Sequence, residues 1–202
     1  MKQWMFPKKS ELVEFQLGLC RDFHEVVRQY PVEAGWSSMR DEYGLEIYSP
    51  RIDVAVGPFA THERLGHIYD EMMDNPRIRR FIERLIEYNR LNLERHDGFV
   101  RAATFEEITE SNYNARCLIA IEIENQVSRK HLMGGAINAS ALGRIGIVIP
   151  WSNEKLKAFV KLVRYLQYLK YAEKNTFNTT NLLIITREQI QSAIEEALQN
   201  NI

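Results

Sequence analysis

The sequence predicts an α/β protein with a mixed central sheet and helices on both faces of that sheet. In the second half of the chain, short apolar runs typical of buried strands alternate with amphipathic segments that have helical spacing. Such strand–helix repeats indicate that at least part of the sheet is parallel. The length of 202 residues and a hydrophobic content of 45% suit one domain with a sizeable core. We therefore expect a single domain over residues 1–202.

The first half of the chain is predicted to contain two strands between helical segments. Ser10 is a suitable N-cap for the first helix, and Pro31 stops it. Turn residues at Gly57-Pro58 close the second strand, and Asn75-Pro76 breaks the later helical segment once. In order, the predicted elements are a helix over 10–30, strands over 45–48 and 51–56, and a helical segment over 62–95.

The second half is predicted to alternate regularly between strands and helices. The predicted elements are a strand over 117–124, a helix over 128–142, a strand over 145–150, a helix over 153–175, a strand over 181–186 and a helix over 187–199. Small residues dominate the helix over 128–142, which favours close packing on the sheet. In the helix over 153–175 we interpret the stripe of Tyr165, Tyr168, Leu169 and Ala172 as core, and not as a platform for stacking nucleobases.

Composition and charge indicate a cytoplasmic protein that is not inserted in a membrane. The N-terminal residues 1–9 lack the apolar region of a signal peptide, and no stretch reaches the roughly 18 apolar residues of a membrane span. Cys20 and Cys117 are not in a metal-binding spacing, so we expect both to be reduced. The net charge of −1 points to no particular partner.

Three carboxylates stand out against the apolar strands. Glu122 and Glu124 follow an apolar run and, being two residues apart, share one face of the strand about 7 Å apart. Acids on one face at the end of a core strand are costly unless a cation compensates them, and a divalent metal would do so. Asp53 lies within the strand over 51–56, where aspartate is disfavoured. Two structural alternatives remain: in one, the glutamates mark the polar end of an exposed edge strand, and in the other, Asp53 forms a salt bridge with Arg51.

The arrangement of these acids resembles the PD-(D/E)XK nuclease superfamily. One acid lies in Ser49–Asp53 and the next acids in Ile121–Glu124, which is followed by a helix and another strand. The resemblance covers residues 45–53 and 117–151, and the opening helix also fits. It implies a restriction endonuclease-like fold, in which residues 62–96 form a helical insertion between the two acid-bearing strands.

The resemblance implies a Mg²⁺-dependent (or Mn²⁺-dependent) DNA endonuclease. Asp53 and Glu122 would bind the metal, because oxygen ligands suit these ions. Glu124 takes the place where the family usually has lysine, and it would orient or deprotonate the attacking water. Lys130 in the following helix would then stabilise charge on the phosphate. Glu11 or Glu14 of the first helix would be the additional acid that assists metal binding in parts of the family.

The absence of the usual lysine leaves a second hypothesis open, namely a non-catalytic relative that binds nucleic acid or a protein. A hydrolase acting on sugars is a weaker third one, because two acids side by side on a strand do not flank a sugar ring. DNA as the partner is supported by an excess of basic residues over residues 128–174. These are Arg129, Lys130, Arg144, Lys155, Lys157, Lys161, Arg164, Lys170 and Lys174. Cleavage of both DNA strands would favour a homodimer.

Overall fold

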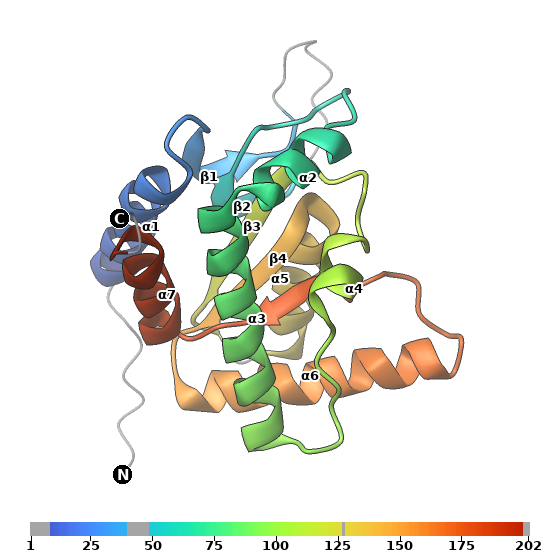
Figure 1. Cartoon of the computed structure of the whole chain (residues 1–202). Coiled ribbons are helices and arrows are strands. Elements are labelled where there is room, and N and C mark those ends of the chain that lie inside the picture. Colours follow the sequence, from blue (N-terminus) through green and yellow to red (C-terminus); the bar gives the residue numbers. More distant parts are fainter. Residues whose placement is uncertain (1–8, 40–48, 127, 200–202) are drawn as a thin grey trace.

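The computed structural model describes residues 9–39, 49–126 and 128–199, and over them the chain forms one five-stranded sheet surrounded by helices (Figure 1). Along the chain the elements are α1 (Lys9–Val27), β1 (Val32–Ser37), β2 (Arg51–Val56), α2 (Gly66–Asp74), α3 (Pro76–His96), α4 (Phe105–Thr109), β3 (Cys117–Glu124), α5 (Arg129–Leu142), β4 (Gly143–Pro150), α6 (Asn153–Tyr171), β5 (Leu182–Ile184) and α7 (Arg187–Gln199).

The sheet is mixed, as the sequence predicts, and its strands lie in chain order from β1 to β5. Strand β2 is antiparallel to both of its neighbours, β1 and β3. The pairs β3–β4 and β4–β5 are parallel. The parallel connections run through α5 and α6, and α2, α3 and α4 lie between β2 and β3 in the chain. The carboxyl ends of β3, β4 and β5 therefore meet at one edge of the sheet.

Helices cover both faces of the sheet, which confirms the predicted α/β layering. On one face, α1, α3 and α7 pack over the sheet (Figure 1), and their apolar side chains join those of the strands in the largest hydrophobic cluster. On the other face, α5 and α6 enclose a second cluster with side chains of β4 and β5. Among the helices that the structure describes, none is long and apolar enough to cross a membrane.

The lack of a side chain at Gly146 of β4 allows the backbone of α5 to approach this strand very closely. A Cβ atom added at Gly146 of β4 would lie 2.7 Å from the carbonyl carbon of Ala139, well inside van der Waals contact. By contrast, a Cβ atom at Gly134, also in α5, would meet no heavy atom within 4 Å. The close approach fixes α5 against the sheet face that carries the three acids.

A Gly146→Ala substitution is expected to lower the free energy of unfolding by about 1–3 kcal/mol, because backbone atoms of α5 must shift to admit the methyl group. The matched Gly134→Ala substitution is expected to be neutral or stabilising by up to about 1 kcal/mol, since alanine is the better helix former. Urea denaturation of both variants measures the difference. Equal stability of the two variants would show that the α5–β4 contact is not tight.

The predicted strand over 45–48 lies outside the described residues. Where the two can be compared, the structure differs from the sequence-based prediction at β1, at α4 and at the tyrosine stripe of α6. Strand β1 and the short helix α4 were not predicted; β1 contains Gly35 with a φ of +60°, and it is held by pairing with β2 rather than by strand propensity. The interpretation of the tyrosine stripe as core is wrong: 50% of Tyr165 and 64% of Tyr168 are exposed. The reason is that the C-terminal part of α6 extends past the sheet (Figure 1).

Candidate functional site

The register of β2 and β3 brings two of the predicted acids together. Val54 pairs with Ile121 and Ala55 with Ala120, so the antiparallel register sets Asp53 opposite Glu122. Directly opposed residues point to the same face of a sheet. Their side chains lie close enough that each affects the pKa of the other. One metal ion with ligand distances of about 2.0–2.1 Å can take one ligand from each of two directly opposed residues.

Asp53 is held from two sides. The backbone N–H of Ile123 donates a hydrogen bond of 2.7 Å to its Oδ2 atom, and the Gln16 side chain of α1 donates to its backbone carbonyl. The alternative partner, Arg51, instead donates from Nε to the carbonyl of Gly35 at 3.2 Å. Asp53 is thus oriented by the neighbouring strand.

Glu122 is positioned by helix α5. The Nδ2 atom of Asn138 donates to Oε1 of Glu122 over 3.3 Å. Gly135 lies one turn earlier on α5, and a Cβ atom there would be 3.7 Å from the Cβ of Glu122. The lack of a side chain at Gly135 lets helix α5 pass close to Glu122.

Burial raises the pKa values of both acids of the pair, and the negative charge of Asp53 raises that of Glu122 further. Burial is the main cause that raises the pKa of Glu122 to about 8, and the charge of Asp53 raises it further, while the Asn138 hydrogen bond opposes the shift. Burial also raises the pKa of Asp53, although the Ile123 N–H bond opposes that change. Glu122 therefore holds its proton more tightly than an exposed glutamate does. A cation between the two groups would favour the charged forms of both and so oppose this shift.

Glu124 lies on the same face, next to two basic side chains. Burial raises the pKa of Glu124, whereas a hydrogen bond from the Gln126 N–H and the charges of His131 and Lys155 lower it. A Cβ atom at Gly135 would lie 4.0 Å from Oε2 of Glu124, so Gly135 of α5 lies beside both glutamates. Glu124 therefore lies beside the pair formed by Asp53 and Glu122.

The predicted helper residues lie further from the centre of this arrangement. Lys130 is exposed in the first turn of α5, and both Glu11 and Glu14 are exposed on α1. The structure instead places Lys155, only 7% exposed, near Glu124 at the start of α6. Burial lowers the pKa of Lys155, and the Glu124 carboxylate opposes that shift.

Sequence reasoning missed Lys155, although a signal was present. Lys155 precedes Phe159, Leu162 and Leu166 at spacings of four, three and four residues, which puts it on the apolar face of α6. A lysine on the face that packs against the protein is unusual, because lysine is almost never buried without a partner.

The two carboxyl groups of Asp53 and Glu122 suit a metal ion that needs few protein ligands. Over residues 9–39, 49–126 and 128–199, no three side chains of histidine, cysteine, aspartate or glutamate converge to hold a metal ion. Mg²⁺ is commonly bound through one or two carboxylates, with water and substrate oxygens completing its shell. Asp53 and Glu122 fit that requirement.

Comparisons of the chain with protein-family models, curated proteins and solved structures found no significant match.

Proposed function

We propose that the protein is a Mg²⁺-dependent DNA endonuclease with a restriction endonuclease-like fold. The observation that carries the proposal is the opposition of Asp53 and Glu122 on neighbouring strands, with Glu124 beside them. The order of elements supports it: a helix, a strand, the strand with Asp53, the strand with the glutamates, then a helix and a strand. Helices α2, α3 and α4 would be the insertion between the acid-bearing strands.

The proposed reaction is hydrolysis of a phosphodiester bond. Asp53 and Glu122 would hold Mg²⁺ (or Mn²⁺), which when bound supplies a Lewis acid that neutralises charge on the phosphate and makes a water easier to deprotonate. Glu124 accepts a proton from the attacking water, whose oxygen forms the new bond to phosphorus. The bond from phosphorus to the leaving oxygen breaks, and that oxygen takes up a proton.

The lysine that the superfamily usually carries at the position of Glu124 has two possible substitutes. Lys130 is the substitute that the sequence predicts, in the helix after β3. Lys155 is better supported, because it is buried near Glu124 and so approaches the acids from the side of β4. Either ammonium group would stabilise negative charge that develops on the phosphate.

A second candidate function is a nucleic-acid-binding protein without catalysis. The observation that favours it is Glu124 itself, which places a third carboxyl group where a phosphate would have to approach. This candidate predicts DNA binding without cleavage under every metal condition.

Incubation of purified protein with plasmid DNA tests the proposal. Nicking is expected in Mg²⁺ or Mn²⁺, and it is expected to stop in EDTA and to resume when the metal is restored. Asp53→Ala and Glu122→Ala variants, purified identically, should not nick the plasmid. Equal nicking by all three proteins would mean a contaminating nuclease, and binding without nicking would favour the second candidate.

A further inference from the structure

Beyond its first turn, the exposed side chains of α6 are all basic or aromatic. From Lys155 to Ala172 the sequence contains no acidic residue. At helical spacing, one exposed stripe runs along this segment. We call it the α6 outer face, and it consists of Lys157, Lys161, Arg164, Tyr165, Tyr168 and Tyr171.

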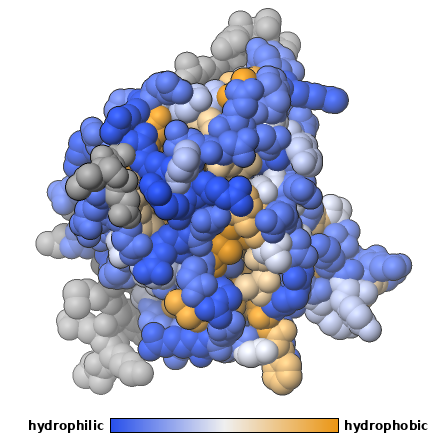
Figure 2. Space-filling model, viewed as in Figure 1, coloured by the Kyte–Doolittle hydropathy of each residue, from blue (hydrophilic) through white to orange (hydrophobic). Residues whose placement is uncertain are grey.

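The tyrosines of this face are unusually accessible. Tyr171 is 89% exposed, more than either Tyr165 or Tyr168, and the three rings follow one another at intervals of three residues. Side chains three residues apart on a helix are neighbours, so the rings form a continuous strip. In Figure 2 the surface is mostly hydrophilic on the face shown, and hydrophobic residues are exposed only in small areas.

A fourth aromatic ring lies beside this strip. Phe99, in the connection between α3 and α4, is 85% exposed, and the Arg164 guanidinium carbon lies 5.1 Å from the centre of its ring. Arg164 also pairs with Asp97 at 3.1 Å, which fixes the guanidinium between the loop and α6. The loop thus presents a flat ring at the border of the α6 outer face.

The α6 outer face leads away from the acid site. Lys155 near Glu124 lies in the first turn of α6, and the 19 residues of the helix extend about 28 Å from that point. The lysines occupy the half of the face nearer the acids, and the tyrosines occupy the far half.

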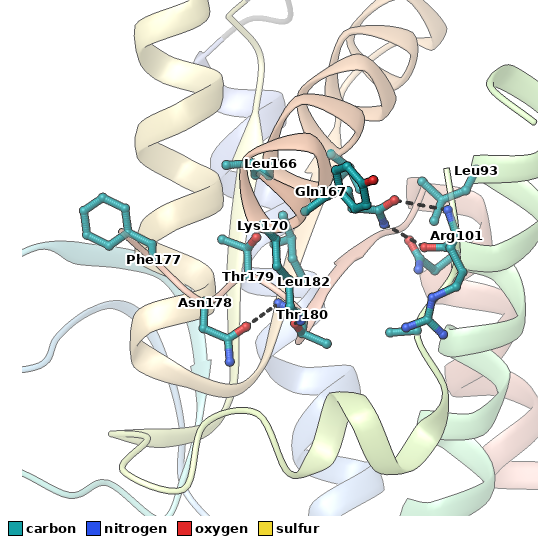
Figure 3. A pocket seen from close by; sticks show the side chains of 14 residues that line it. Leu93, Arg101, Leu166, Gln167, Lys170, Phe177, Asn178, Thr179, Thr180 and Leu182 are labelled. Carbon is teal, nitrogen blue, oxygen red and sulfur yellow. Dashed lines mark hydrogen bonds between the residues drawn. The ribbon is translucent and has the colours of Figure 1, made fainter. Parts of the chain in front are cut away.

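A cavity of about 290 Å³ opens at the far end of α6. Figure 3 shows Lys170, Phe177, Asn178 and Thr180 around it, with Gln167 linked by hydrogen bonds to the backbone of Arg101. Tyr171 belongs both to the cavity wall and to the α6 outer face, so the two features are continuous. The cavity offers a ring together with amide, hydroxyl and ammonium groups, a combination that suits a nucleobase and its phosphate.

We propose that the α6 outer face binds single-stranded nucleic acid. Basic groups would contact the phosphates, and bases would stack on Tyr165, Tyr168 and Tyr171, a combination that proteins binding single strands commonly use. The charge of the α6 outer face favours nucleic acid over a second copy of the protein. A stripe with cations and no acids complements a polyanion, whereas two such stripes would repel each other. The identity of the substrate rests on the proposed nuclease function. If the protein cuts DNA, its substrate would carry an unpaired segment next to the bond that is cut.

Fluorescence anisotropy in EDTA tests the surface without any cleavage. A labelled oligo(dT) strand is expected to bind more tightly than a blunt duplex of the same length. Tyr168→Ala and Tyr171→Ala should each weaken binding of the strand about 5- to 150-fold, whereas Tyr168→Phe and Tyr171→Phe should retain it, because the stacking ring remains. Lys157→Gln and Lys161→Gln should each lower the slope of log affinity against log salt by about 0.7.

Three outcomes would overturn this inference: unchanged affinity of the alanine variants, tighter binding of the duplex, or a wild-type dimer that the alanine variants convert to monomer in sedimentation. The last result would make the face a contact between copies. The test is independent of catalysis, since binding is measured in EDTA, where no cleavage is expected. Loss of nicking with this binding pattern intact would reject only the nuclease, and nicking without the pattern would reject only the α6 surface.

Discussion

A Glu122→Gln substitution is expected to abolish Mg²⁺-dependent cleavage and, at pH 8, to make the protein more stable than wild type. The pKa of Glu122 in the folded protein is about 8, above its ordinary value of 4.5. Between these two values the unfolded chain binds fewer protons than the folded one, so stability falls as the pH rises through this range. The slope is at most about 1.4 kcal/mol per pH unit. Glutamine resembles the protonated carboxyl but never ionises, and so it avoids this loss.

Urea denaturation at pH 5, 6, 7 and 8 in EDTA measures the effect. The wild type should lose stability relative to Glu122→Gln with each step, and added Mg²⁺ should stabilise only the wild type, because a ligand that binds the folded state alone stabilises it. Glu106→Gln, at an exposed acid of α4, is the control and should follow the wild type. Parallel curves for wild type and Glu122→Gln would show that Glu122 ionises normally in the folded protein.

A Lys155→Met substitution is expected to lower the cleavage rate at saturating DNA by about 10²- to 10³-fold, the typical loss when one group that stabilises transition-state charge is removed. Methionine keeps an unbranched side chain of similar length, so the start of α6 should remain packed. Lys130→Met is the matched comparison. Since Lys130 is exposed, this variant should lose less than about tenfold.

Single-turnover cleavage of a labelled substrate measures both variants, and DNA affinity in EDTA shows whether binding has changed. If Lys130→Met has the larger effect on rate, the assignment to Lys155 is wrong and the sequence-based choice is right. A similar small effect of both substitutions would mean that the acids and the metal act without a lysine.

Much of the fold follows from local signals in the sequence. The limits of β3 and α7 and the break before Pro76 agree with prediction, because apolar runs, caps and proline act on neighbouring residues. The same holds for Glu122 and Glu124, whose common face follows from the alternation of side chains along one strand. By contrast, β1 has weak strand propensity and forms through its partner β2, which local reasoning could not foresee.

The sequence by itself thus determined the α/β class, most elements and the three acids on two strands. Only the tertiary structure decided that Asp53 and Glu122 meet, because their proximity depends on the register between two strands that are joined by three helices. It also decided that Lys155 is buried and that Tyr168 is exposed, which is the reverse of what their side chains prefer. Both outcomes depend on which segments pack against α6, and α6 starts beside the acids but ends beyond the sheet.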